Sequence, residues 1–275
     1  MIWAIIPVKP LRESKSRLSA VLTPEERARL TGFLLQRTLG ILSKIPAIDR
    51  IMVVSRDPEA LKVARQGGAI TLVEGDRPGL NVALLRAAYV AAARRASSLL
   101  ILPSDLPLLT EADVQMMLIG AMPANGLRPV TGMANGHSNG YQNGHSTNSP
   151  NGHNKDHLHS PNGHLNGVNG HINGTQGSVT VHDATATNPR LVLPEYPKAI
   201  TICPDHHEDG TNALFIRPAI GFTFRYGPDS FHQHIQEAEQ HGMFYRVVHA
   251  PGIKFDLDTE ADWMMYQTIF RQETG

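Results

Sequence analysis

The segment from Pro7 to Leu18 is one of three polar segments whose side chains could do chemistry together. It carries four basic residues within nine positions: Lys9, Arg12, Lys15 and Arg17. These cations could converge on a polyphosphate, although from composition alone a solvated basic loop explains them equally well. The segment contains no glycine, so it is neither a Walker loop nor a GxGxxG loop.

The other two segments are acidic. Asp105 follows the apolar run 99–102, and an aspartate at the tip of a buried strand suits Mg²⁺ binding. The alternative is a turn aspartate that accepts hydrogen bonds from backbone N–H groups. Asp256 and Asp258 are two residues apart, so in an extended segment both point to one side and could face one cation. Asp258 could instead cap a helix that begins beside Thr259.

The elements that must position these segments alternate along the chain. Apolar runs predict strands at 2–8, 51–55, 69–73, 99–102, 199–203, 213–217 and 244–249. Helices are predicted after Thr23-Pro24 and Asp57-Pro58, over 80–96, after Thr110, from a capping box at Ser230–Gln233, and over 259–271. This pattern indicates an α/β fold: a mostly parallel sheet with helices on both faces and at least one late antiparallel strand. Ligands of such sheets bind at the carboxyl ends of the strands, where all three polar segments fall.

Residues 123–197 interrupt the pattern. The triplet NGH recurs from Asn135 to Asn169, and seven of the fourteen histidines lie between His137 and His171. The segment has almost no large apolar side chains to bury. Burial therefore cannot offset the entropy lost on ordering the backbone, about 1–2 kcal/mol per residue, and we predict a disordered insertion. We therefore divide the chain into 1–122, 123–197 and 198–275, the first and last forming a single domain. A weak metal-binding role for the histidines stays open, and deleting residues 133–177 would test it.

Composition excludes several classes of protein. The 25 basic and 25 acidic residues give zero net charge, which excludes a generally basic nucleic-acid binder. The single cysteine, Cys203, excludes an internal disulfide and a cysteine-rich metal site. No apolar run approaches the ~20 residues that span a bilayer. We expect a cytoplasmic protein with neither nucleic acid nor membrane as a partner. The basic loop and the two acidic segments favour nucleotide and Mg²⁺ chemistry.

Five motifs, in order, resemble the guanylyltransferase family of deazaflavin coenzyme F-420 biosynthesis. Its members transfer GMP from GTP to phosphoenolpyruvate or 2-phospho-L-lactate. The motifs are IPVK at 6–9 with SKSRL at 14–18, DLPL at 105–108, GTNAL at 210–214, GPDS at 227–230 and FDLDT at 255–259. Together they cover nearly everything outside the insertion. One departure is Glu208-Asp209 where the family usually reads GTGTNAL, which predicts a shifted loop.

The resemblance implies a nucleotidyltransferase fold and a set of roles. The implied Mg²⁺ ligands are Asp105, Asp256 and Asp258, and the cations along the GTP phosphates are Lys9, Lys15 and Arg17. Thr211, Asn212, Gly227 and Ser230 would hold the phosphorylated acid, and Asn81 would lie near the base. The first part of the domain would then bind the nucleotide, and the last part the acceptor and the metal. A helix beginning at Ser230 would also offer free N–H groups to the acceptor's anion.

The residues leave several phosphorylated three-carbon acids open as the acceptor. No residue separates phosphoenolpyruvate from 2-phospho-L-lactate, and 3-phosphoglycerate is a further alternative. We favour phosphoenolpyruvate because the chain is bacterial in style. Sugar-phosphate or molybdopterin nucleotidylyltransferases are an alternative, against which the absent glycine-rich first loop counts. The resemblance also implies a homodimer.

Overall fold

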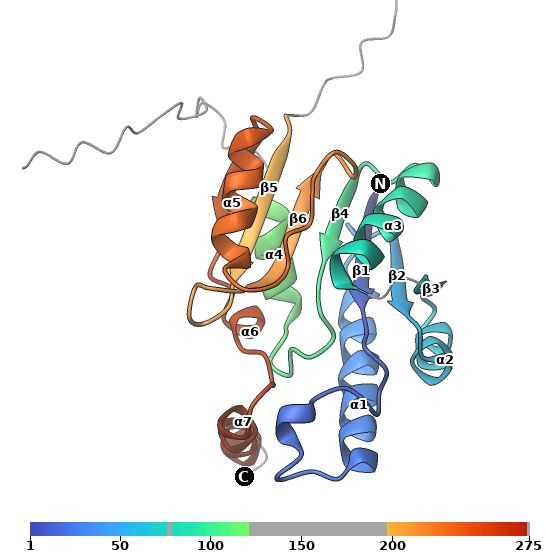
Figure 1. The fold of residues 1–275 in the computed structure, drawn as a ribbon, viewed down its shortest axis with the longest axis vertical. Helices are drawn as coiled ribbons and strands as arrows, with labels where there is room; N and C mark the ends of the chain where they lie inside the picture. Colours follow the sequence, from blue (N-terminus) through green and yellow to red (C-terminus); the bar gives the residue numbers. More distant parts are fainter. Residues whose placement is uncertain (76–78, 121–196, 274–275) are drawn as a thin grey trace, which may run out of the picture. The chain divides into compact units, whose positions relative to one another are not determined.

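The computed structural model describes residues 1–75, 79–120 and 197–273, all within one compact unit of the chain. Their strands form one sheet in the order β3-β2-β1-β4-β6-β5-β7 (Figure 1). The strands are β1 (Ile2–Pro7), β2 (Arg50–Ser55), β3 (Ile70–Val73), β4 (Ser98–Ile101), β5 (Ala199–Pro204), β6 (Thr211–Arg217) and β7 (Phe244–Val247). Within this sheet only β6 runs antiparallel to its neighbours, β4 and β5. The predicted mostly parallel sheet with a late antiparallel strand is confirmed.

Seven α-helices and one 3₁₀ turn accompany the described strands. They are η1 (Ser16–Leu18), α1 (Pro24–Leu42), α2 (Pro58–Gln66), α3 (Leu80–Ala93), α4 (Glu111–Gly120), α5 (Ser230–Gln240), α6 (Pro251–Lys254) and α7 (Glu260–Glu273). The short elements η1 and α6 were not expected from the sequence. The start of α1 is as predicted, since the Thr23 side chain accepts a hydrogen bond from the Glu26 backbone N–H at 3.3 Å.

The capping box predicted at Ser230 is wrong. Asp229, in the left-handed conformation with φ 56°, precedes α5 and makes no side-chain cap. The Ser230 hydroxyl oxygen instead accepts a hydrogen bond from the Thr211 backbone N–H at 2.9 Å. The sequence pattern predicted correctly where the helix begins but not what the serine binds, because its partner, Thr211, belongs to β6.

Helices cover both faces of the sheet because alternate strand residues point to opposite sides. On β1, Ala4 and Ile6 belong to the apolar cluster under α1, α2 and α4, whereas Trp3 and Ile5 belong to the cluster under α3 and α5. Figure 1 shows α3 and α5 in front of the sheet and α4 behind it. Both clusters are buried, so the sheet is a rigid platform for the loops at its edge.

The strand order reverses direction at β1. The chain moves outward from β1 to β2 and β3, and then returns to the other side of β1 with β4. Because β6 is antiparallel to β4, its first residue, Thr211, lies at the edge where β1 and β4 end. This edge is therefore where a ligand site is expected.

The histidine-rich segment and its predicted disorder lie outside the described residues, so the three-part division of the chain stays a prediction. Strands from both sides of that segment pair in one sheet, since β4 contacts β6. None of the described helices combines the length with the apolar composition that a membrane span requires.

Candidate active site

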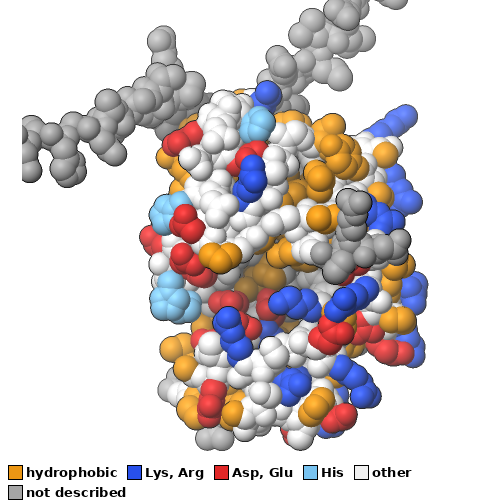
Figure 2. All heavy atoms as spheres, in the orientation of Figure 1, with side chains coloured by type: hydrophobic (Ala, Val, Ile, Leu, Met, Phe, Trp, Pro, Cys, Tyr) orange, Lys and Arg blue, Asp and Glu red, His pale blue; other side chains and the backbone are white. Residues whose placement is uncertain are grey.

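A cavity of about 550 Å³ opens at the carboxyl ends of β1 and β4. Its walls come from the loop after β1, the loop after β4, the start of β6, the start of α3 and the segment before α7. The polar residues lining it include Lys9, Ser14, Lys15, Arg56, Glu74, Ser104, Asp105, Thr211, Asn212, Tyr226, Asp256 and Asp258. Figure 2 shows basic and acidic side chains gathered side by side across the lower middle of this face. Seven of the residues predicted from the sequence thus share one cavity.

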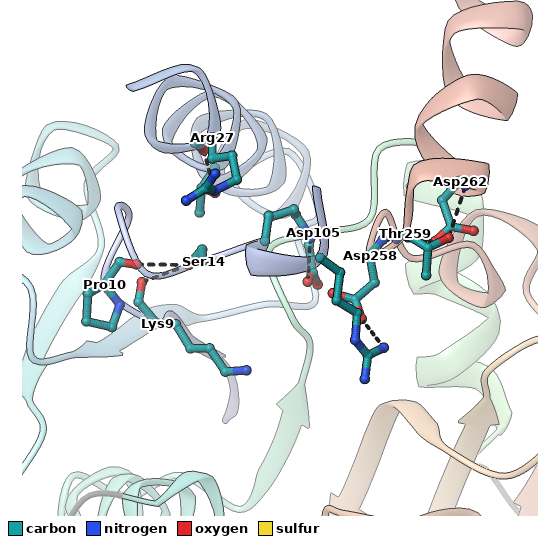
Figure 3. Close-up of polar contacts among 11 residues, drawn as sticks. Lys9, Pro10, Ser14, Arg27, Asp105, Asp258, Thr259 and Asp262 are labelled. Carbon is teal, nitrogen blue, oxygen red and sulfur yellow. Dashed lines mark hydrogen bonds and ion pairs between the residues drawn. The ribbon is translucent and has the colours of Figure 1, made fainter. Parts of the chain in front are cut away.

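The loop after β1 is folded by its own backbone bonds. The Ser14 N–H and hydroxyl both donate to the Pro10 carbonyl oxygen, at 2.9 and 3.0 Å (Figure 3). The Leu11 N–H donates to the Asp57 carboxylate at 2.7 Å, which fixes the loop to the N-terminus of α2. Lys15, the residue after Ser14, adopts the left-handed conformation with φ 59°. Such backbone is uncommon outside glycine, and here it turns the Lys15 side chain inward.

Lys15 and Asp105 form the most buried ion pair of the site. The Lys15 Nζ lies 2.9 Å from the Asp105 Oδ2, and the lysine side chain is only 3% exposed. A lysine this deeply buried needs a charged partner, because an unpaired charge away from water is costly. Asp105 is therefore not a turn aspartate bound only to backbone N–H groups.

The other three cations of the loop lie nearer the solvent. Arg17 Nη1 is 2.8 Å from Asp258 Oδ2, and both side chains are partly exposed. Arg12 pairs with Glu25 at 3.6 Å and does not line the cavity. Lys9 is exposed and lines the cavity; in Figure 3 it extends toward the side where Asp105 and Asp258 lie. Of the four basic residues, Lys9 and Lys15 line the cavity, Arg17 reaches it only through its pair with Asp258, and Arg12 does neither.

The two acidic segments are joined by backbone. The Leu257 N–H donates to the Asp105 carbonyl oxygen at 3.1 Å, which holds Asp256 and Asp258 beside Asp105. Burial raises the pKa of the Asp256 carboxyl, and the nearby Asp105 carboxylate raises it further. Asp258 does not cap the last helix, because Thr259 and Asp262 form that capping box between themselves (Figure 3). Asp258 is therefore left to face the cavity and Arg17.

The chemistry of the donor set, though not its present spacing, suits a hard divalent cation. Asp105, Asp256 and Asp258 present carboxylate oxygens to one cavity, and oxygen is the ligand Mg²⁺ prefers. Burial is the main cause of the raised pKa of Asp256, and the Asp105 carboxylate adds a repulsion that a bound cation would relieve. In the described part of the chain, however, no three His, Cys, Asp or Glu side chains lie close enough to hold a metal. Two of the three predicted ligands instead contact Lys15 and Arg17.

The loop before β6 delivers Thr211 to the cavity. The Asp205 carboxylate accepts hydrogen bonds from the N–H groups of His207, Asp209 and Gly210 at 3.0–3.2 Å. A Cβ at position 210 would lie 2.6 Å from the Asp205 Oδ2, so a larger residue there would displace this carboxylate from its hydrogen bonds. Asp205 thus organises the turn in which the sequence departs from the family motif, and Thr211 still lines the cavity.

Asn212 lines the cavity, and its side chain bonds to the backbone of α6. Its amide nitrogen donates to the Ile253 carbonyl oxygen at 2.8 Å and to the Lys254 carbonyl oxygen at 3.3 Å. These bonds hold the end of α6, from which the chain continues directly to Asp256. Its predicted contact with the acceptor stays a prediction, and its observed contacts position the acidic segment.

Gly227 and Ser230 lie behind the lining of the cavity. Gly227 has φ 141°, a conformation that favours glycine, and its carbonyl oxygen accepts the Ser230 N–H at 3.2 Å. The Phe231 N–H donates to the Asp209 carbonyl oxygen at 3.0 Å. We expected the N–H groups at the N-terminus of α5 to be free, but two of them are already bonded. Their acceptors are carbonyl oxygens of the segment before α5 and of the loop before β6.

Asn81 joins α3 to the segment 222–229, the last part of the connection between β6 and α5. Its amide nitrogen donates to the Tyr226 carbonyl oxygen at 3.0 Å, and its amide oxygen accepts the Tyr226 N–H at 2.8 Å. It is not among the residues lining the cavity, whereas Tyr226 is. The Tyr226 hydroxyl is buried, and no described residue accepts or donates a hydrogen bond to it.

The sequence reading missed His234. It is fully buried, and its Nδ1 lies 2.9 Å from the Thr211 Oγ1 while its Nε2 accepts the Arg225 N–H at 2.9 Å. Burial lowers its pKa to about 4. The available signal was the helical spacing of Phe231, His234 and Ala238, which predicts that all three share the buried face of α5. Spacing could reveal the burial of His234 but not its partners.

Comparison with known proteins identifies the family. The family model described as "Guanylyl transferase CofC like" matches residues 2–125 and 192–268. The chain is 32% identical over 261 residues to a phosphoenolpyruvate guanylyltransferase of Rubrobacter xylanophilus, covering 95% of this chain and 91% of that protein. It is 37% identical over 130 residues to a 2-phospho-L-lactate guanylyltransferase of Methanothermobacter thermautotrophicus, covering 45% of this chain and 57% of that protein.

Solved structures show the same fold at low sequence identity. A nucleotidyl transferase from Methanothermobacter thermautotrophicus aligns with a TM-score of 0.53 at 11% identity, covering 99% of both chains. A 4-diphosphocytidyl-2C-methyl-D-erythritol synthase from Anaerococcus prevotii aligns with a TM-score of 0.50 at 10% identity, covering 98% of this chain and 96% of that one. The predicted nucleotidyltransferase-type fold is confirmed. Since the family model matches well over half of the sequence, the chain belongs to the CofC-like guanylyl transferase family.

Proposed function

We propose that this protein transfers GMP from GTP to phosphoenolpyruvate, releasing pyrophosphate and forming enolpyruvoyl-2-diphospho-5'-guanosine for deazaflavin coenzyme F-420 biosynthesis. The observation that carries the proposal is the convergence of Lys15, Asp105, Asp256 and Thr211 on one cavity at the switch point of the sheet. Those residues come from distant parts of the chain, and each belongs to a motif of the family. The Rubrobacter relative, which is named for this activity, is similar over nearly the whole chain.

The acceptor supplies its own nucleophile. A phosphate oxygen of phosphoenolpyruvate attacks the α-phosphorus of GTP, a new P–O–P bond forms, and the bond to pyrophosphate breaks. The second pKa of a phosphate monoester is about 6, so near neutral pH this oxygen is already ionised and no general base is required. The protein's task is to bring two anions together in line.

Basic side chains and carboxylates divide that task. Lys9, Lys15 and Arg17 would lie along the triphosphate, where their charge offsets the repulsion between the two substrates. Asp105, Asp256 and Asp258 would hold Mg²⁺, which when bound neutralises phosphate charge. The Lys15–Asp105 and Arg17–Asp258 pairs then keep cations and carboxylates at the site before the substrates arrive.

The acceptor would bind on the opposite wall. Thr211 lines the cavity there, with Ser230 directly behind it. A neutral hydroxyl can donate to the phosphate or carboxylate of a three-carbon acid. Asn212, Gly227 and Asn81 would support this wall through the backbone contacts described above.

The test is a substrate panel on the purified full chain. GTP and Mg²⁺ are supplied with phosphoenolpyruvate, 2-phospho-L-lactate or 3-phosphoglycerate, and the GMP-linked product and pyrophosphate are quantified by liquid chromatography and mass spectrometry. We expect the highest kcat/KM with phosphoenolpyruvate. Preference for another acid would contradict the acceptor assignment, and no transfer to any of them would contradict the activity. Arg12→Met, which removes a loop cation outside the cavity, is the matched control for variants of Lys9 and Lys15, which line it.

A further inference from the structure

The hydrogen-bond chain behind the acceptor wall runs from the Arg225 backbone through His234 to Thr211. His234 is a buried residue of α5 that faces the segment 222–229. The centroid of its ring lies 5.7 Å from that of Phe222 and 4.9 Å from that of Tyr226. Its two ring nitrogens have different partners. The geometry of those partners determines which nitrogen carries the proton.

The Nε2 atom of His234 must be the unprotonated one. It faces the Arg225 backbone N–H at 2.9 Å, and a backbone N–H can only donate. In a neutral imidazole the proton then resides on Nδ1, so Nδ1 donates to the Thr211 Oγ1, 2.9 Å away. Burial keeps the ring neutral, since it lowers the pKa of His234 to about 4.

The direction of that bond determines what Thr211 offers to a ligand. Its hydroxyl oxygen accepts from His234, so its own proton is left to donate elsewhere. Among the described residues the hydroxyl has no other partner, and Thr211 lines the cavity. Were the histidine tautomer reversed, Thr211 would donate inward and present oxygen lone pairs to the cavity, where they would repel an anion.

We propose that His234 is a positioning residue for the acceptor: it orients the Thr211 hydroxyl so that this group donates a hydrogen bond to an anionic oxygen of the phosphorylated three-carbon acid. The inference rests on the proposed function, because it assigns the Thr211 side of the cavity to the acceptor. It requires that a histidine with no access to substrate controls the affinity for one substrate and not for the other.

Two substitutions separate the two bonds of His234. His234→Gln can place an acceptor near the former Nε2 and keep the Arg225 contact, but it loses the donor at Nδ1. His234→Asn can place an amide N–H near the former Nδ1 and keep the Thr211 contact. We expect His234→Gln to raise KM for phosphoenolpyruvate about tenfold with KM for GTP within about twofold, and His234→Asn to recover most of that loss.

A double-mutant cycle with Thr211→Val provides the second arm. Without the hydroxyl there is nothing for His234 to orient, so adding His234→Gln should raise the acceptor KM no further. A structural role for His234 would instead change both KM values together, or would add to the effect of Thr211→Val. Either result would overturn the inference. The wild-type chain is assayed first, and failure to form product there counts against the proposed function and not against this inference.

One measurement needs no variant. A long-range ¹H–¹⁵N spectrum of the full chain reports the tautomer of each histidine through its ring nitrogen shifts. We expect His234 to carry its proton on Nδ1 at pH 7. A proton on Nε2, or a doubly protonated ring, would overturn the inference even if His234→Gln failed to fold.

Discussion

The two walls of the cavity are built from different interactions. The basic wall, formed by the Lys9–Arg17 loop, presents its cations in ion pairs, and two of these, Arg17–Asp258 and Arg12–Glu25, are largely exposed. The neutral wall, formed by Thr211, the segment 222–229 and the start of α5, is held by buried hydrogen bonds. Exposed ion pairs contribute little and can exchange partners, whereas buried bonds fix a shape. One wall is suited to following a charged triphosphate, and the other to presenting a fixed surface to a small acid.

The largest expected effect lies where the walls meet, at the carboxylates. Asp105→Ala and Asp256→Ala should each lower guanylyl transfer by at least about 1,000-fold, because the metal and its charge are lost from the reacting phosphates. Pyrophosphate release measures the activity, and far-ultraviolet circular dichroism checks that the fold is kept. Normal turnover in either variant would contradict the metal assignment.

On the basic wall, burial should separate one cation from its neighbours. Lys15→Met removes an ammonium that is 3% exposed and leaves the Asp105 carboxylate unpaired. We expect kcat/KM for GTP to fall about 100-fold in Lys15→Met but to stay within about twofold in Arg12→Met, whose exposed pair lies outside the cavity. Equal losses in the two variants would mean that the loop acts only through its total charge.

The neutral wall should make the fold sensitive to acid. Burial lowers the pKa of His234 from its ordinary value of 6.5 to about 4, so in mild acid the unfolded chain binds a proton that the folded chain excludes. Stability should therefore fall as the pH drops from 6.5 to 4, by about 2 kcal/mol at pH 5. The charges facing the ring are Glu237, which favours protonation, and Arg225, which opposes it.

Denaturant unfolding of wild type and His234→Gln at pH 7 and pH 5 checks this prediction. The variant lacks the titrating ring, so its free energy of unfolding should fall less between the two pH values. The same loss in both proteins would show that other groups cause the acid sensitivity.

The smallest expected effect is on the contact between α3 and the neutral wall. Asn81→Leu removes both hydrogen bonds to the Tyr226 backbone and should lower the free energy of unfolding by about 1 kcal/mol. Asn81→Asp keeps the acceptor for the Tyr226 N–H but sets a carboxylate oxygen against the Tyr226 carbonyl oxygen, so it should lose at least as much stability. If Asn81→Leu changed KM for GTP but not stability, Asn81 would bind the nucleotide as the family resemblance implies.

How far the sequence could predict each wall depends on how local its contacts are. Thr23 and Glu26 lie one helical turn apart and bond to each other, so the start of α1 was predicted correctly. Ser230 stands in the same kind of pattern, but its hydroxyl bonds to Thr211, which no local rule could foresee. Asp105 was placed at the site by a general property of α/β sheets. Which buried atoms His234 meets depends on three elements packing together, and no sequence period encodes that.

The most direct test of the whole account is to locate the metal. We would crystallise the full chain with a non-hydrolysable GTP analogue and Mn²⁺, and collect anomalous diffraction data at the manganese absorption edge. The account predicts an anomalous peak in the cavity, bound by carboxylate oxygens of Asp105, Asp256 and Asp258, with the triphosphate beside Lys15. A metal and triphosphate bound outside this cavity would contradict it.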